Sequence, residues 1–209
     1  SMLTLLGMAA ISFHFYDTLP PTIATKFDFS GEPTQYSSKE FVVIFLPMVF
    51  AGLIVLINAL VKISPHKFSM PNSKKTMDTI VFGTGLLLLG IHIGMVTDPG
   101  GQVTFAKYFS WGMALFLIVV GNVFGKTERN FFMGIRVPWT LSTEANWKAT
   151  HRFAGKLMVT FGVLLMAVTF FYSTVGFAVA FILLPTLVPV YYSYRYYKLY
   201  EKGKEPIEA

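Results

Sequence analysis

The stretch EFVVIFLPMVFAGLIVLINALVKI, residues 40–63, decides the fold. Its only charged side chains are Glu40 at its start and Lys62 beside its end. A helix needs about 20 consecutive, mostly apolar residues to cross the hydrocarbon core of a bilayer. This stretch is long enough and apolar enough to do so, and it predicts a transmembrane helix with Pro47 near its entry.

Five further apolar stretches of similar character lie on both sides of it. The six predicted spans are residues 2–16, 40–63, 76–96, 105–124, 153–172 and 175–194. Only 13% of the chain is charged and its mean hydropathy is +0.57, whereas soluble domains carry about 25% charged residues. The sequence therefore predicts an all-α polytopic bundle, with residues 1–209 forming a single integral-membrane domain.

The distribution of Lys and Arg predicts the orientation. Of the 17 basic residues, all but Lys26, Lys39 and Lys107 fall on one side of the predicted spans. Because basic residues collect on cytoplasmic loops, both termini and the loop 125–152 are predicted to be cytoplasmic. The loop 17–39 is then the main outer surface. This bias also accounts for the net charge of +6 without direct contact to nucleic acid.

Several chemistries have no support in the sequence. There is no cysteine, so disulfides and thiolate ligands are excluded. The histidines His14, His66, His92 and His151 are far apart in the chain, which disfavours a metal site. No phosphate-binding loop, zinc-protease or serine-hydrolase motif occurs. We predict no catalytic residue, no metal and no cofactor.

A few residues inside the spans predict helix contacts. Gly90 and Gly94 form one small-xxx-small pair and Gly121 and Gly125 another, and such pairs let transmembrane backbones approach closely. His92 lies in the outer part of its span. An ionisable residue at that depth is either functional or hydrogen-bonded to a neighbouring helix, and the sequence leaves both open.

The two long loops carry most of the remaining chemistry. The outer loop 17–39 is predicted to be ordered, with Phe27 and Phe29 as anchors. The segment NFFMGIRVPWTLSTEANWKATHR, residues 130–152, combines Asn, Arg, Trp and His densely. Ser142 can cap a new helix, which would place Trp147 and His151 on one face. This segment either simply seats the loop in the headgroup layer, where Trp139 and Trp147 would suit, or forms a specific surface.

These two loops carry a resemblance to a known family. Residues 130–142, followed by Asn146-Trp147, Thr150-His151-Arg152 and Gly155, resemble the signature of the SdpI family of bacterial membrane immunity proteins. The outer run DTLP (17–20), Ile23-Ala24-Thr25 and FDFSGEP (27–33) resembles the domain of unknown function that opens many members. Val137 stands where members more often have Thr.

The resemblance implies protection of the bacterial plasma membrane against a secreted toxin peptide or protein. It also implies signalling, in which the toxin-engaged protein holds a transcriptional repressor at the membrane. The implied binding residues of the cytoplasmic loop are Asn130, Gly134, Arg136, Pro138, Trp139, Asn146, Trp147, His151 and Arg152. Those of the outer loop are Asp28, Gly31 and Glu32.

Two other function classes stay open at this point. A small-molecule or ion transporter would use broken helices, for which Pro47, Pro185 and Pro189 are hints. An intramembrane enzyme acting on lipid would need a convergent polar site. His92 facing Asp98, or His14 facing Asp17, would favour that alternative.

Overall fold

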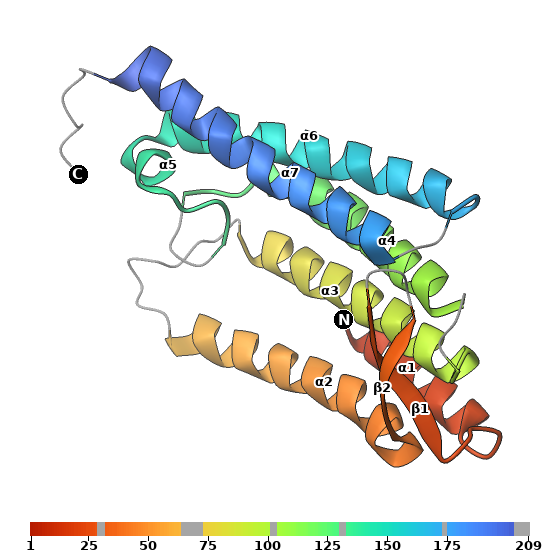
Figure 1. Ribbon diagram of the computed structural model, residues 1–209. Helices are drawn as coiled ribbons and strands as arrows, with labels where there is room; N and C mark the ends of the chain where they lie inside the picture. The colour runs from red at the N-terminus through yellow and green to blue at the C-terminus, as the bar shows by residue number, and fades with distance from the viewer. Residues whose placement is uncertain (29–31, 64–72, 101–103, 130–132, 173–174, 203–209) are drawn as a thin grey trace.

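The computed structural model describes residues 1–28, 32–63, 73–100, 104–129, 133–172 and 175–202, and the chain is 78% helical (Figure 1). The helices are α1 (Met2–Phe15), α2 (Lys39–Ile63), α3 (Ser73–Thr97), α4 (Thr104–Phe124), α5 (Pro138–Ser142), α6 (Glu144–Thr169) and α7 (Val175–Tyr196). A π-helical turn, η2 (Tyr197–Glu201), continues α7, and strands β1 (Thr22–Phe27) and β2 (Pro33–Ser38) form a hairpin.

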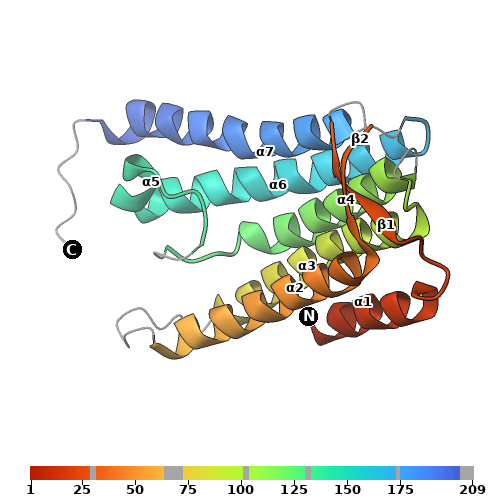
Figure 2. The same ribbon diagram turned by 60° about the horizontal axis from the view of Figure 1, so that its bottom comes forward.

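Within the described residues, five helices are long and apolar enough to cross a membrane, namely α2, α3, α4, α6 and α7 with η2. The protein is therefore a multi-pass membrane protein, as predicted. The helix α1 has 14 residues, or about 21 Å at 1.5 Å per residue. It lies beside the half of α2 and α3 that is nearer the hairpin (Figure 2). The crossing predicted for residues 2–16 stays a prediction.

Glycines hold three of these helices in close contact. A Cβ atom on Gly90 of α3 would lie 2.7 Å from the Tyr108 carbonyl oxygen of α4. A Cβ atom on Gly155 of α6 would lie 2.6 Å from the Gly121 carbonyl oxygen, also of α4. Both distances are too short for a real side chain, so the predicted close packing at the glycine pairs is confirmed. The pair Gly121 and Gly125 faces α6 rather than α3.

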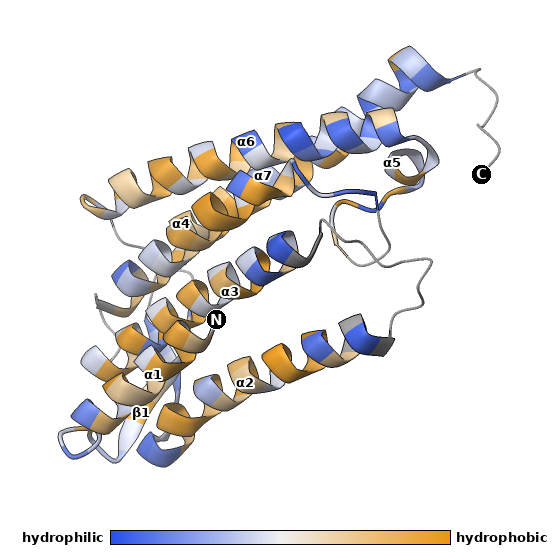
Figure 3. Cartoon of the chain, turned by 180° about the vertical axis from the view of Figure 1, so that it is seen from behind, coloured by the Kyte–Doolittle hydropathy of each residue, from blue (hydrophilic) through white to orange (hydrophobic). Residues whose placement is uncertain are grey.

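The main hydrophobic core surrounds α4. Ala114, Leu117 and Val120 of this helix are buried against Met158 and Leu165 of α6. Hydrophobic residues make up much of α2 and α7 (Figure 3). Many of their side chains are exposed, among them Met48, Leu56 and Leu187. This arrangement is that of a helix bundle whose solvent is hydrocarbon rather than water.

The hairpin is a β element that the predicted all-α bundle did not include. β1 and β2 pair antiparallel, with Ile23 opposite Ser37 and Ala24 opposite Tyr36. Ile23 and Ala24 are adjacent in β1 and both are buried, and the register shifts after them, between Ala24 and Lys26. Because burial of two adjacent residues departs from the two-residue alternation that marks a half-buried strand, the sequence pattern gave no strand signal.

The hairpin is fixed to the bundle, which confirms the predicted order of the described part of the outer loop. The Ala24 N–H donates to the Pro99 carbonyl oxygen at 3.0 Å. The Phe27 ring stacks on Phe105 of α4 with centroids 3.8 Å apart. Ile23 is buried among apolar residues that include Val42 of α2. Phe27 is thus an anchor as predicted, whereas Phe29 lies outside the described residues.

The fifth predicted span begins earlier than expected. α6 begins at Glu144, so the polar segment before residue 153 is helical and continuous with the apolar segment. Its N-cap is Thr143, whose hydroxyl accepts from the Asn146 N–H at 3.1 Å, and not Ser142 as predicted. Ser142 instead ends α5, where its hydroxyl donates to the Trp139 carbonyl oxygen at 2.8 Å.

Candidate functional site

The segment that carries the resemblance lies at the end of the bundle opposite the hairpin (Figures 1 and 2). We call this region the motif end: the described residues of 126–152 together with Ser193 of α7 and Glu201 of η2. It packs around the first two turns of α6. Asn146, Trp147, Thr150 and His151 on those turns are all fully buried.

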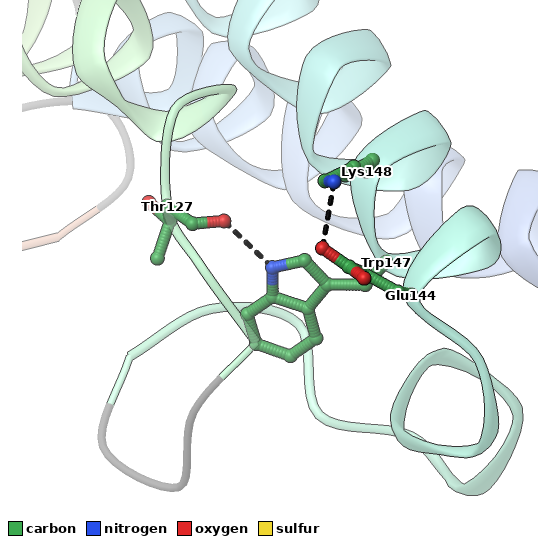
Figure 4. Close-up of polar contacts among 4 residues, drawn as sticks. All are labelled: Thr127, Glu144, Trp147 and Lys148. Atoms are coloured by element: carbon green, nitrogen blue, oxygen red, sulfur yellow. Dashed lines mark hydrogen bonds and ion pairs between the residues drawn. The ribbon is translucent and has the colours of Figure 1, made fainter. Parts of the chain in front are cut away.

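Trp147 and His151 form the centre of the motif end. They lie one turn apart, as predicted, and their rings stack with centroids 4.0 Å apart and planes at 22°. The Trp147 indole N–H donates to the Thr127 carbonyl oxygen at 2.7 Å, which joins α6 to the segment after α4 (Figure 4). The Trp147 side chain is 0% exposed, so it is packed inside the protein.

The hydrogen bonds of His151 determine its tautomer. The Ile135 backbone N–H donates to Nε2 at 3.0 Å, so this nitrogen must carry a lone pair. Nδ1, 2.8 Å from the Trp147 carbonyl oxygen, therefore carries the proton and donates it. A neutral imidazole with both nitrogens bonded holds the extended segment before α5 against α6.

Gly134 is required by this arrangement. Its φ is +108°, a conformation that residues with a Cβ rarely adopt. An added Cβ would also collide with the His151 imidazole and lie 3.0 Å from the Trp147 ring. The glycine therefore lets the backbone pass directly over the stacked pair.

The short helix α5 follows from local chemistry. Val137 is extended, as expected before proline, and Pro138 occupies the first helical position, where its missing N–H costs nothing. The buried Thr140 hydroxyl accepts from the Val137 N–H at 3.1 Å and donates to the Ile135 carbonyl oxygen at 2.7 Å. At the other end, Arg129 donates to the Leu141 carbonyl oxygen at 2.9 Å.

Polar side chains join the motif end to α7. The Trp139 indole N–H donates to the Ser193 hydroxyl at 2.6 Å. The Asn146 amide donates to the Ser193 carbonyl oxygen and to Glu201, both at 3.2 Å. The Thr143 hydroxyl donates to the other carboxylate oxygen of Glu201. Thr150 donates to the Asn146 side-chain oxygen at 3.0 Å. Both the nitrogen and the oxygen of the Asn146 side-chain amide are therefore hydrogen-bonded.

The two charged site residues of the motif end are exposed instead. Arg136 and Arg152 both face outward, and neither forms a hydrogen bond or ion pair with any described residue. Arg152 shares the outer face of α6 with Lys148 and Lys156, at spacings of four residues. Lys148 is paired with Glu144 at 2.6 Å (Figure 4). The two arginines are therefore the site residues available to bind an anionic partner.

The outer predicted residues lie at the tip of the hairpin. The Asp28 N–H donates to the Glu32 carbonyl oxygen at 3.0 Å. The Glu32 N–H donates to the Asp28 carboxylate at 2.9 Å. This reciprocal pair closes the turn. Gly31 and, in the inner loop, Asn130 lie outside the described residues.

His92 is used in helix packing. It is fully buried, and its Nε2 lies 2.8 Å from the hydroxyl of Ser12 on α1. His14 contacts the edge of Phe15. Across the described ranges, no group of three or more His, Asp or Glu side chains could hold a metal ion.

Sequence reasoning missed the residues that partner the motif. They are Thr127, Thr140, Thr143, Ser193 and Glu201. Thr140 and Thr143 stand within the motif itself, but Ser193 and Glu201 are about fifty residues away. No local pattern marks those two, because only the packing of α7 on α6 brings them to the motif.

Comparison with known proteins finds similarity in both of these polar regions. Residues 126–193 match the SdpI/YfhL protein family, and residues 3–51 match a domain of unknown function, DUF1648. The chain is 24% identical over 193 residues to the immunity protein SdpI of Bacillus subtilis (strain 168), covering 90% of this chain and 89% of that protein. No solved structure matches. The resemblance to the SdpI family is confirmed.

Proposed function

From this match to the SdpI/YfhL family, we propose that the protein is a bacterial membrane immunity protein that protects its cell against a secreted toxin. The observation that carries the proposal is the similarity to an immunity protein along 90% of the chain. The match includes both the hairpin region and the motif end, so it is not confined to apolar helices whose composition alone would produce similarity.

We place the protein in the plasma membrane as one domain with six spans and both termini in the cytoplasm. The five long apolar helices supply most of the crossings. The excess of Lys and Arg on the side of the motif end supports a cytoplasmic position for it. The hairpin, at the opposite end of the bundle (Figure 2), then faces the outside.

The hairpin is the proposed contact for the toxin. It projects Lys26, Asp28 and Glu32, which are exposed, and the side chains of Thr34, Gln35 and Tyr36 on β2 are exposed as well. Ala24 of the hairpin is hydrogen-bonded to Pro99, and Phe27 is stacked on Phe105 of α4. A ligand that displaces the hairpin would therefore also displace these two residues. A toxin that prefers one hairpin position would thereby bias the bundle.

α4 and α6 provide a direct route to the motif end. α4 begins beneath Phe27 and ends at Phe124, whose ring lies 5.1 Å from that of His151. Its contact with α6 at Gly121 and Gly155 is backbone against backbone, which leaves little freedom for independent movement. We propose that Arg136 and Arg152 then bind a cytoplasmic partner through their positive charge. In family members that signal, this partner is a transcriptional repressor.

Survival in a toxin-sensitive strain tests the proposal. The wild-type protein should restore growth in the presence of the family's secreted toxin. Arg136→Gln and Arg152→Gln should reduce recruitment of the repressor without reducing the amount of protein in the membrane, because both side chains are exposed. Lys148→Gln removes the same charge from a residue outside the implied site and should retain recruitment.

Two outcomes would count against this assignment. Cells that express full amounts of wild-type protein and still die would remove the immunity function. Full retention of both survival and recruitment in Arg136→Gln and Arg152→Gln would remove these arginines from the mechanism.

A further inference from the structure

A groove of about 400 Å³ runs along the outer side of α7 and η2, where they meet α6. We call it the tyrosine groove. Four tyrosines, one cation and three apolar side chains line it. The tyrosines are Tyr191, Tyr192, Tyr196 and Tyr200. The cation is Arg195, and Phe153, Val188 and Leu199 are apolar.

The walls of the groove are held by aromatic contacts. Tyr192 packs on Phe153 of α6 with centroids 4.5 Å apart. The ring centroid of Tyr196 lies 4.8 Å from that of Tyr200 and 6.3 Å from that of Tyr192. One face of α7 and η2 is therefore a continuous row of aromatic rings. These contacts involve only the rings. The tyrosine hydroxyls form no hydrogen bond with any described residue, so they can donate to a ligand.

The chemistry of the groove changes along its length. At one end Val188 and Phe153 are apolar, as the hydrocarbon layer requires. Toward the chain end, Arg195 stands in the last turn of α7 and is exposed, without an ion pair to any described residue. Tyrosines at such a boundary are typical of the interfacial layer of a membrane, where their rings sit at headgroup level.

The surrounding charge is mainly positive. Arg152 and Lys156 flank Phe153 in α6, and both are exposed. Lys198 lies 5.4 Å from the ring centroid of Tyr194. Among the described residues, the acid in this region is Glu201, whose carboxylate oxygens accept from Thr143 and Asn146. An occupant with a negative headgroup therefore meets unpaired cations and hydroxyl donors.

We propose that the tyrosine groove binds an anionic phospholipid. Arg195 takes the phosphate through paired N–H donors, the tyrosine hydroxyls contribute further donors, and the acyl chain lies along Val188 and Phe153. The groove combines an apolar wall with a cation, which suits a lipid better than free phosphate. With the proposed orientation this is a lipid of the cytoplasmic leaflet, but the groove and its charge are independent of any toxin.

Native mass spectrometry of the full-length protein in detergent tests this binding. Phosphatidylglycerol and phosphatidylcholine are titrated separately against the wild type, Arg195→Gln and Lys148→Gln. The wild type should retain phosphatidylglycerol about fivefold more tightly than phosphatidylcholine, and Arg195→Gln should lose about that factor. Lys148→Gln makes the same charge change away from the groove and should match the wild type.

Several outcomes would overturn the proposal. One is equal retention of phosphatidylglycerol and phosphatidylcholine by the wild type. Another is an equal loss of phosphatidylglycerol affinity in Arg195→Gln and Lys148→Gln, which would mean non-specific electrostatic attraction. Displacement by equimolar inorganic phosphate would make the groove a free-phosphate site. A dimer that Arg195→Gln dissociates would make it an interface between copies.

Arg195→Lys guards against a folding defect, since it keeps the charge but loses the paired donors and should show an intermediate affinity. Toxin survival is scored in parallel with lipid retention. The two readouts are separate, so loss of one proposal leaves the other standing.

Discussion

At the scale of single residues, most of the family motif builds structure. Gly134, Asn146, Trp147 and His151 were implied as binding residues, yet their polar groups and surfaces are used inside the protein. Their buried donors and acceptors are paired, and breaking such a pair costs about 1–3 kcal/mol. In the proposed function, recognition by the motif end therefore falls to exposed residues such as Arg136 and Arg152.

Gly134→Ala should lower the free energy of unfolding by about 1–3 kcal/mol from backbone strain alone, with a further loss from the collision with His151. Thermal unfolding in detergent measures it. Gly52→Ala is the matched control: a Cβ there meets nothing within 4 Å, and alanine in a helix stabilises by about 0.5–1 kcal/mol. Equal melting temperatures for the two variants would contradict the role assigned to Gly134.

His151→Phe keeps a ring on Trp147 but removes both hydrogen bonds of the imidazole. The Ile135 N–H is then left without its acceptor, and we expect a loss of about 1–3 kcal/mol for that group. Amide hydrogen exchange at Ile135 should speed up in the same variant. The exposed His14→Phe serves as control, and unchanged exchange at Ile135 would contradict the assigned hydrogen bond.

Prediction from sequence succeeded for these residues where partners are close in the chain. The four-residue spacing of Trp147 and His151 placed them on one face, and their rings do stack. The spacing did not show that Trp147 is buried, with its indole N–H bonded to the Thr127 carbonyl oxygen. Ser193 and Glu201 were missed since their contact with the motif depends on tertiary packing.

At the scale of elements, the protein is organised by close helix pairs around α4. Long apolar runs made five of the helices predictable from sequence, to within a few residues at most ends. The start of α6 was misplaced because its first turns are polar. An apolar pattern marks only the later part of this helix, although the helix is continuous from Glu144. The hairpin was missed because Ile23 and Ala24 are adjacent and both buried, which departs from the alternating pattern of a half-buried strand.

Gly155→Ala should separate α6 from α4. Its Cβ would lie 2.6 Å from the Gly121 carbonyl oxygen, a backbone atom that cannot rotate away. We expect a loss of about 1–3 kcal/mol, as for other over-packed sites, measured by thermal unfolding. Gly7→Ala is the control, since its Cβ meets only the Leu89 side chain at an ordinary 3.7 Å. A Gly155→Ala protein as stable as Gly7→Ala would mean that the helices are not in backbone contact.

Phe27→Ala should loosen the hairpin without unfolding the bundle. The stack on Phe105 contributes about 0.5–1.5 kcal/mol beyond the buried area. Limited proteolysis of the segment 17–39 should become faster, whereas Tyr36→Ala, which removes an exposed ring of β2, should not change it. Equal cleavage rates in the two variants would argue that the hairpin is held by other contacts.

At the scale of the whole molecule, the bundle separates two polar structures. The hairpin caps one end and the motif end closes the other, with apolar helices between them (Figures 1 and 3). Charge counting predicted which side each loop faces, and the structure places the two loops at opposite ends, which that prediction requires. The glycine pairs predicted close packing, but the sequence did not show that Gly121 packs on Gly155 of α6, which is a contact of the folded bundle.

Site-directed accessibility labelling in intact cells tests this arrangement most directly. The chain has no cysteine, so Lys26→Cys in the hairpin and Lys148→Cys in the motif end each introduce a single thiol at an exposed position. A membrane-impermeant maleimide should label Lys26→Cys in intact cells and Lys148→Cys only after permeabilisation. Labelling of both from the same side would contradict the account.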